Sequence, residues 1–177
     1  MGRPFTPAKN TPDKDIVMTP PFVAKNIINH YNPTGTILDP CRGRGAFYDQ
    51  YPEHCEKDWC ELAEGKSFYD YQKKVNWIIT NPPWSEMRRF ILHGMTVADD
   101  IVYLTTINHY TTKARMRDIR DCLFGIKEFH CIKTPPKDTG WPQIGFQLGA
   151  IHIQRHWNGD IKLSGDLHHF DFVGLLI

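Results

Sequence analysis

The residues Asn81, Pro82, Pro83 and Trp84 are the part of the sequence whose types and order most directly suggest chemistry. They follow the apolar stretch VNWIIT (75–80), which is typical of a buried strand. The two prolines lack N–H groups and fix φ near about −65°, so the strand must end in a rigid corner. An amide and an indole side chain border that corner. The sequence therefore predicts a binding or catalytic site at the end of this strand.

A second candidate is the turn DPCRGRGAF (39–47), which follows the short apolar strand TILD (36–39). Gly43 and Gly45 have no Cβ, so the backbone there can pass close to a ligand. A dinucleotide fingerprint would need a small residue three positions after the second glycine, where this chain has Tyr48, and no GK[ST] follows to make a P-loop. Asp39 at the strand end would repel a pyrophosphate. The turn suits a ligand with a cationic or hydrogen-bond-donating group.

Another acidic residue, Glu61, ends the next apolar segment, 57–62. In an open α/β sheet a carboxylate at this place can accept hydrogen bonds from both hydroxyls of a ribose. A ligand that joins an adenosine to a cationic amino-acid tail is S-adenosylmethionine. The pair of acids and the glycine turn predict this cofactor.

Alternating strands and helices predict the elements that position these residues. Phe22, Val23, Ile27 and Ile28 recur at helical spacing behind Thr19, a candidate N-cap. In chain order we expect a helix at 22–31, a strand at 36–39, a helix from the turn 40–51, strands at 57–62 and 75–80, a helix at 85–95, a strand at 101–107, a basic helix at 112–123, and an antiparallel pair at 128–133 and 145–157. This order favours an α/β fold, a doubly wound and mostly parallel seven-stranded sheet with a C-terminal antiparallel hairpin.

Size and composition bound the class of protein. With 177 residues, 41% of them hydrophobic, we expect one domain at 15–177 after a flexible arm at 1–14. No apolar run has the length of a membrane span, so we expect a soluble, cytoplasmic protein with no membrane partner, located at the host nucleoid if its origin is viral or bacterial. The five cysteines include no CxxC pair, and the spacing of the C-terminal histidines fits no usual metal site, so no disulfide framework and no metal site are predicted.

The two motifs resemble those of a known family. DPCRGRGAF resembles the first cofactor motif of class I S-adenosylmethionine-dependent methyltransferases, and NPPW resembles the (N/D/S)PP(Y/F/W) motif of the amino-methyltransferases. TPPFVAKNII (19–28) is similar to the segment that precedes the first strand in the DNA N6-adenine enzymes. The resemblance covers 19–107 well and the closing strands loosely. It implies a Rossmann-like methyltransferase domain without a separate target-recognition domain.

The resemblance also implies roles for single residues in cofactor binding. Thr19 and Pro20 would lie against the methionine end of the cofactor, Asp39 and Pro40 near its amine, Gly43 and Gly45 along its tail, Glu61 at the ribose, and Leu62 on the adenine. Family members often present an aspartate beside an aromatic residue to the adenine amino group. This chain offers Ser67 and Phe68 instead, so that contact falls to the backbone, to the Ser67 hydroxyl, or to Asp70 if the register slips.

For the NPPW corner the resemblance implies transfer of a methyl group to an exocyclic or side-chain nitrogen. The lone pair of an adenine amine is delocalised into the ring, and two acceptors around its N–H groups would localise it: the Asn81 side-chain oxygen and the Pro82 carbonyl. Pro83 would stiffen the corner, and Trp84 would stack on an extruded base. We expect methylation of adenine N6 in DNA. An RNA adenine, a protein glutamine, or a non-catalytic cofactor-binding subunit remain the alternatives.

The substrate polymer has its own expected contacts. The net charge is only +1, but 113–137 holds seven Lys or Arg against three acids. Arg88, Lys113, Arg115, Arg117 and Trp141 are the candidate nucleic-acid contacts, with solvated helix residues as the alternative for the cations. Asn108, His109 and Tyr110 either border the target pocket or cap a loop. Because the chain has no room for a recognition domain, we expect modest sequence specificity, a short or unpaired target, or a partner, which would be a specificity subunit or a second copy in a homo-oligomer.

Overall fold

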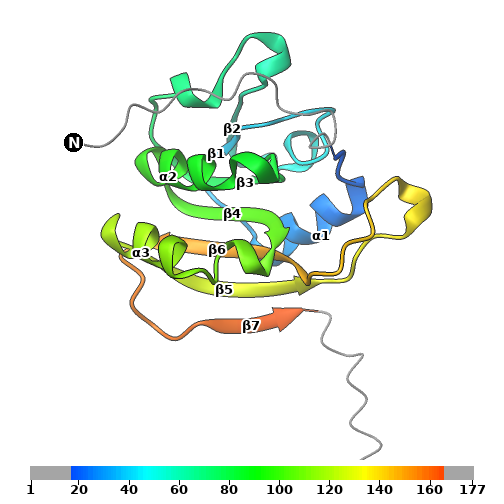
Figure 1. Ribbon diagram of the computed structural model, residues 1–177. Helices are drawn as coiled ribbons and strands as arrows, with labels where there is room; N and C mark the ends of the chain where they lie inside the picture. Colours follow the sequence, from blue (N-terminus) through cyan, green and yellow to red (C-terminus); the bar gives the residue numbers. More distant parts are fainter. Residues whose placement is uncertain (1–16, 166–177) are drawn as a thin grey trace, which may run out of the picture.

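The computed structural model describes residues 17–165. The arm expected at 1–14 and two of the C-terminal histidines, His168 and His169, lie outside these residues. The described chain builds a seven-stranded sheet in the order β2-β1-β3-β4-β6-β5-β7 (Figure 1). None of the described helices is long and apolar enough to cross a membrane.

The strands and helices follow one another along the chain as the sequence predicts, with two exceptions given below. The strands are β1 (Thr36–Asp39), β2 (Glu56–Trp59), β3 (Val75–Thr80), β4 (Ala98–Thr106), β5 (Phe124–Ile132), β6 (Leu148–Arg155) and β7 (Lys162–Gly165). The α-helices are α1 (Pro21–Tyr31), α2 (Met87–Val97) and α3 (Lys113–Asp121), and short 3-10 turns connect several of these elements.

The sheet is mostly parallel, which confirms the predicted fold class. β1 pairs in parallel with β2 and β3, and β3 in parallel with β4. The predicted antiparallel pair is β5 and β6, and β6 also runs antiparallel to β4. β7 adds to β5 in parallel and forms the edge of the sheet. The sequence did not reveal β7, because it is four residues long and has no clear alternation of apolar residues.

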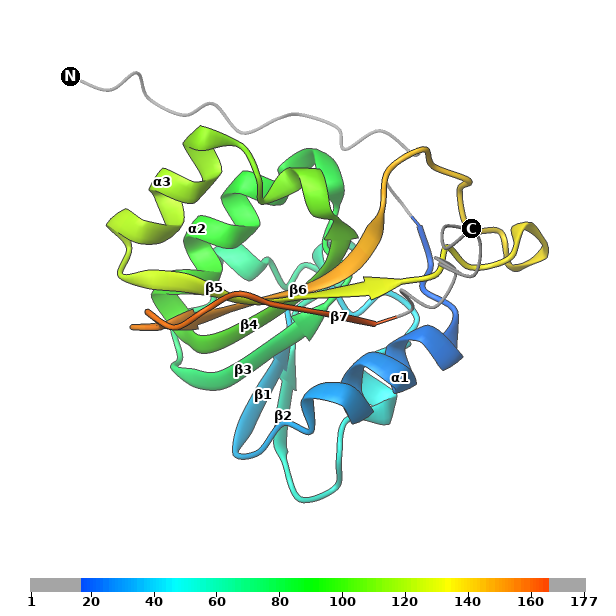
Figure 2. The same cartoon turned by 90° about the horizontal axis from the view of Figure 1, so that it is seen from below.

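Helices cover both faces of the sheet: α2 and α3 lie on one face and α1 on the other (Figure 2). This explains the continuous apolar run in β3, since Ile78 and Ile79 point to opposite faces and both are fully buried. Ile78 packs in the core beneath α2 and α3, and Ile79 packs in the core beneath α1. A strand that is anchored on both faces holds its carboxyl end, and therefore the NPPW corner, in one place.

The first helix begins at Pro21, one residue before the predicted range, and its N-cap differs from the predicted one. Pro20 is the N-cap, without a side-chain hydrogen bond, and Pro21 opens the helix. A proline is well placed in the first turn because an N–H there has no partner within the helix. Thr19, expected as the N-cap, is instead buried before the helix.

The helix expected from the turn 40–51 is wrong. The structure has only a 3-10 turn at Tyr48–Gln50, after which Tyr51 is extended. Pro52 explains this, because it disfavours a helical conformation at the residue before it and cannot donate to the Tyr48 carbonyl. The turn is anchored differently: the Tyr51 side chain is buried, and its hydroxyl donates to the Ile79 carbonyl of β3 at 2.5 Å.

Replacing Tyr51 by phenylalanine should destabilise the fold through this single contact. Loss of a buried hydrogen bond costs about 1 kcal/mol. We expect the urea midpoint of Tyr51→Phe to fall while the slope of the transition stays unchanged. Tyr48→Phe, in a half-exposed neighbour for whose hydroxyl the described residues provide no hydrogen bond, is the control and should unfold like the wild type. Equal midpoints for all three proteins would contradict the assigned role.

Candidate functional site

The carboxyl ends of β1 and β3 lie side by side because the two strands are parallel neighbours. Asp39 ends β1 and Thr80 ends β3, and the Thr80 hydroxyl donates to Asp39 Oδ1 at 2.7 Å. The Cys41 thiol donates to the Asn81 carbonyl at 3.3 Å, and burial raises its pKa, so it stays a thiol and packs. Direct contacts thus join the glycine turn to the NPPW corner, as the sequence predicts for two motifs at one sheet edge.

Asp39 is the most deeply buried acid of this edge, with 1% of its surface exposed. Its Oδ1 accepts from Thr80 and, at 3.3 Å, from the Cys41 N–H, while its buried Oδ2 has no partner among the described residues. Burial is the largest effect on this carboxyl and raises its pKa to about 7, while the Thr80 hydroxyl and the N–H groups of Cys41 and Tyr48 act in the opposite direction. A buried carboxylate oxygen without a donor is costly, and a ligand that brings a cationic donor would satisfy it.

The glycine turn depends on backbone angles that favour glycine: φ is +52° at Gly43 and +86° at Gly45. Glu61 lies two residues beyond the end of β2, where it caps the 3-10 turn Leu62–Glu64, and it closes the glycine turn from there. Its Oε2 accepts from the Gly43 N–H at 2.7 Å, and its Oε1 accepts from the Ala63 N–H at 3.1 Å. Sequence reasoning missed this shaping role, because it joins residues 18 positions apart whose partnership no local pattern encodes. Each oxygen keeps a second lone pair with which it can accept a ligand hydroxyl.

The residues expected around an adenine differ in how they are exposed. Leu62 is 71% exposed, so its side chain is free to pack on a flat ligand. Phe68 is 3% exposed and packs on Phe90 and His93 in the core. The Ser67 hydroxyl accepts from the Tyr69 N–H at 3.2 Å and thereby caps a 3-10 turn. Of the three, Leu62 alone offers a large apolar surface to a ligand.

Asn81 has its amide held in one orientation. Its Nδ2 donates to the Val17 carbonyl at 3.1 Å, and its buried Oδ1 has no partner among the described residues. Because a carbonyl can only accept, this contact places the nitrogen on Val17 and turns the oxygen away from it. The segment before α1 also reaches the glycine turn, since Met18 lies beside Gly43. Thr19 and Pro20 follow in this segment, and both are buried.

Trp84 is half-buried and braced on several sides. Its indole N–H donates to the Leu104 carbonyl of β4 at 3.2 Å. Its ring meets His109 edge-on, with centroids 6.0 Å apart, and Trp141 at 6.3 Å. Trp141 is only 2% exposed, so it supports the Trp84 ring and offers no surface to nucleic acid, contrary to our expectation. His109 does border the corner, and its Nδ1 lies 2.6 Å from the Thr105 hydroxyl.

The expected nucleic-acid cations separate into two groups. Arg88 makes two hydrogen bonds to Asp118, at 2.8 and 3.0 Å, and Arg115 lies 3.5 Å from the same carboxylate and donates to the His109 carbonyl. Asp118 thus partly neutralises both and ties α2 to α3. Lys113 and Arg117, in contrast, lie on the exposed surface of α3.

One histidine group of the described residues has ligand atoms close enough for a metal ion. Single atoms of His30, Glu128 and His130 lie within 4.8 Å of one another. The two imidazole rings are stacked with 19° between their planes, so their in-plane lone pairs do not converge on one point. Glu128 also accepts from Lys162 at 3.0 Å and from Ser164. This arrangement is that of an ion-pair network that joins α1, β5 and β7.

Comparisons with known proteins identify the fold. No protein-family model and no curated protein matches this sequence. A proposed RNA methyltransferase from Pyrococcus horikoshii matches with a TM-score of 0.58 and 11% identity over 79% of this chain and 83% of that one. A proposed class I S-adenosylmethionine-dependent methyltransferase from Listeria monocytogenes matches with a TM-score of 0.61 and 10% identity over 85% of this chain and 66% of that one.

A chain of a type I restriction–modification system matches as well, with a TM-score of 0.54 and 14% identity over 84% of this chain and 44% of that one. This chain thus spans less than half of that neighbour and just under two thirds of the Listeria protein. At these identities the likeness establishes the fold, which is the Rossmann-like fold of class I S-adenosylmethionine-dependent methyltransferases. S-adenosylmethionine, the cofactor predicted from the sequence, is also the cofactor that the Listeria protein's description names.

The stability of the protein should depend on pH through Asp39. Because its pKa is raised from 3.8 to about 7 on folding, the folded state favours the protonated carboxyl. The stability that this preference contributes is present below about pH 4 and is lost as the pH rises through about 7. Asp39→Asn mimics the protonated form at every pH. At pH 8 it should therefore raise the free energy of unfolding by on the order of 4 kcal/mol, measured in urea.

At pH 4 the variant and the wild type should unfold alike, and the difference should grow between pH 4 and 8. Asp49→Asn, which alters an exposed carboxylate beside the same turn, is the matched control and should show no such growth. A constant difference between Asp39→Asn and wild type across this range would disprove the raised pKa.

Proposed function

We propose that this chain is an S-adenosylmethionine-dependent methyltransferase that acts on the N6 amino group of adenine, with DNA as the favoured polymer. The observation that carries the proposal is a pair of buried acceptors without donors among the described residues: Asn81 Oδ1 and Asp39 Oδ2. They belong to neighbouring strand ends that direct contacts join. One acceptor suits the amine of a substrate and the other the amine of a cofactor.

The cofactor fits the residues around the glycine turn. Asp39 Oδ2 would accept from its ammonium group, and the Gly43 and Gly45 backbone would line its tail beside Pro40. Glu61 would hold the ribose, and the exposed Leu62 side chain would cover the adenine. Thr19 and Pro20 would border the methionine end. When bound, the cofactor supplies an electrophilic methyl group on a sulfonium.

The corner prepares the nitrogen that receives this methyl group. Asn81 Oδ1 and the Pro82 carbonyl accept hydrogen bonds from the two N–H groups of the amine, which withdraws its lone pair from the ring. Neither group needs to be a strong base, because the amine proton becomes acidic once the methyl has moved. Pro82 and Pro83 hold the acceptors still, and such positioning contributes several kcal/mol to lowering a barrier.

Trp84 holds the ring that bears the amine. An aromatic face that stacks on an extruded base is worth about 1–3 kcal/mol. The hydrogen bond to Leu104 and the edge-on contacts with His109 and Trp141 fix the plane of the indole before a base arrives. A rigid platform of this kind loses little entropy on binding.

The alternatives differ in substrate or in activity. DNA is favoured because TPPFVAKNII resembles the DNA enzymes, while one structural neighbour is described as an RNA methyltransferase. A glutamine-modifying enzyme would have no salt-dependent affinity for polynucleotides. A non-catalytic subunit would gain nothing from the unpaired Asn81 oxygen, since a buried acceptor without a donor costs about 1–3 kcal/mol. A specificity subunit or a second copy of the chain remains the proposed partner.

The direct experiment offers the purified protein radiolabelled cofactor together with duplex DNA, single-stranded DNA, RNA and cell-extract protein in separate reactions. We expect label in DNA, and none in DNA whose adenines already carry an N6-methyl group. Label in RNA or protein alone would move the substrate to that alternative. Cofactor binding without any transfer would overturn the enzymatic proposal for the isolated chain.

Asn81→Ala should abolish turnover and spare cofactor binding. The substitution removes one of the two acceptors at the amine, and loss of a comparable preorganised group lowers kcat by about 100-fold or more. The cofactor Kd, measured by calorimetry, should stay within a few fold of wild type because Asn81 faces the substrate. Asn26→Ala changes an exposed amide of α1 and serves as the control. Full turnover by Asn81→Ala would show that the motif is misassigned.

Glu61→Ala should have the opposite effect: it should weaken cofactor binding and spare turnover. It removes the ribose acceptor and also the hydrogen bond from the Gly43 N–H, which holds the glycine turn in place. We expect the cofactor Kd to rise by about 10-fold or more, with kcat at saturating cofactor within a few fold of wild type. Glu64→Ala, in an exposed neighbour that pairs with Arg42, provides the comparison. An unchanged Kd for Glu61→Ala would exclude Glu61 from the cofactor site.

A further inference from the structure

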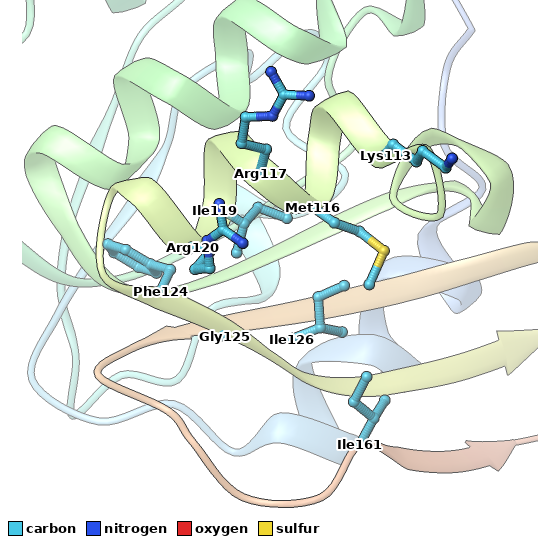
Figure 3. A pocket seen from close by; sticks show the side chains of 9 residues that line it. All are labelled: Lys113, Met116, Arg117, Ile119, Arg120, Phe124, Gly125, Ile126 and Ile161. Carbon is cyan, nitrogen blue, oxygen red and sulfur yellow. The ribbon is translucent and has the colours of Figure 1, made fainter.

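A groove of about 450 Å³ lies between α3 and the beginning of β5, and none of the residues assigned to the cofactor or to the NPPW corner lines it (Figure 3). Its floor is apolar and includes Ile119, Phe124 and Ile126. Met116 from α3 and Ile161 from the segment before β7 point toward one another across it, and each is 49% exposed. Two large apolar side chains that are half-exposed on opposite walls form an apolar surface, and its burial by a ligand would be favourable.

Three cations follow this groove along α3. Lys113, Arg117 and Arg120 are four and three residues apart, so their backbone positions lie along one side of the helix over about 10 Å, and the Arg117 side chain points away from Ile161 in Figure 3. For Lys113 and Arg117 no carboxylate partner occurs within 4.0 Å in the described part of the chain. Arg120 pairs with Asp121 at 3.1 Å, but both side chains are largely exposed, and such pairs are weak. These cations remain available to a polyanion, unlike Arg88 and Arg115.

The row of cations starts at the edge of the sheet that carries the NPPW corner. His109, which touches Trp84, lies only four residues before Lys113. From there α3 runs over the face of the sheet toward the beginning of β5 (Figure 2). A polynucleotide whose target base stacks on Trp84 would therefore pass Lys113 first and the two arginines after it.

We propose that this groove binds the single-stranded polynucleotide that flanks the target base. Lys113, Arg117 and Arg120 contact successive phosphates, and an unstacked base lies between Met116 and Ile161. The inference rests on the proposed function, since it takes a nucleic acid as substrate. Because the aliphatic walls have few groups that read base edges, binding here is tolerant of sequence. A paired duplex cannot place a base in the groove, so the flanking strand must be unpaired.

The test for the phosphate contacts is the salt dependence of oligonucleotide binding, followed by fluorescence anisotropy with a labelled single-stranded 16-mer. Each phosphate contact contributes about −0.7 to the slope of log K against log salt for single strands. The triple variant Lys113→Gln, Arg117→Gln, Arg120→Gln should reduce the magnitude of this slope by about 2 and weaken binding at least tenfold. Lys25→Gln, Lys57→Gln, Lys73→Gln removes the same charge from exposed lysines elsewhere and should leave the slope unchanged. Equal slopes for both triple variants would overturn the inference.

The test for the base compares the same 16-mer with an abasic 16-mer and with polyglutamate of equal charge. Wild type should bind the normal oligonucleotide at least fivefold more tightly than either, and the variant Met116→Ser, Ile161→Ser should lose that preference. Equal binding of the abasic strand or of polyglutamate would overturn the inference and leave a site for any polyanion, an acidic protein segment included.

Methyl transfer by the wild-type protein distinguishes failure of this inference from failure of the proposed function. Labelled DNA together with an unchanged slope in the cationic triple variant would refute the groove and leave the function standing. Absence of both transfer and oligonucleotide binding in the wild type would refute the function itself.

Discussion

The hydrogen bond between Thr80 and Asp39 is the contact on which the site depends. It joins the last residues of two parallel strands, 41 positions apart in sequence, and so fixes the glycine turn relative to the NPPW corner. It satisfies one oxygen of a carboxylate that is otherwise removed from water, and it leaves the other oxygen for a ligand. The two cores on either face of β3 then keep both strand ends from moving.

The sequence was sufficient for the parts of the molecule that local chemistry determines. The bounds of β1 and β3 agree with the apolar stretches 36–39 and 75–80, because strands buried on both faces read as continuous apolar runs. The prolines and glycines predicted the two turns, because each residue type restricts or extends the backbone in a known way. The helix expected after the glycine turn shows the limit, since the single residue Pro52 outweighed the pattern before it.

The parts that the sequence did not reveal depend on partners distant in the chain. Asp118 lies 30 residues from Arg88, and the hydrogen bonds between them tie α2 to α3. The burial of Trp141 follows from its packing against a tryptophan 57 positions earlier, which no periodicity within its own loop could indicate. Glu61 likewise has its structural role because the segment after β2 meets the glycine turn in space. Side-chain exposure in loops is the quantity that sequence patterns predict least well.

The contact between Asn81 and Val17 gives the segment before α1 an unexpected importance. The orientation of the amide at the proposed reaction centre is set by a backbone carbonyl 64 residues upstream. Val17 lies outside the NPPW corner in the sequence, yet its position affects Asn81 directly. A displacement of Val17 would therefore change the orientation of the Asn81 amide while the sheet and its cores stay intact.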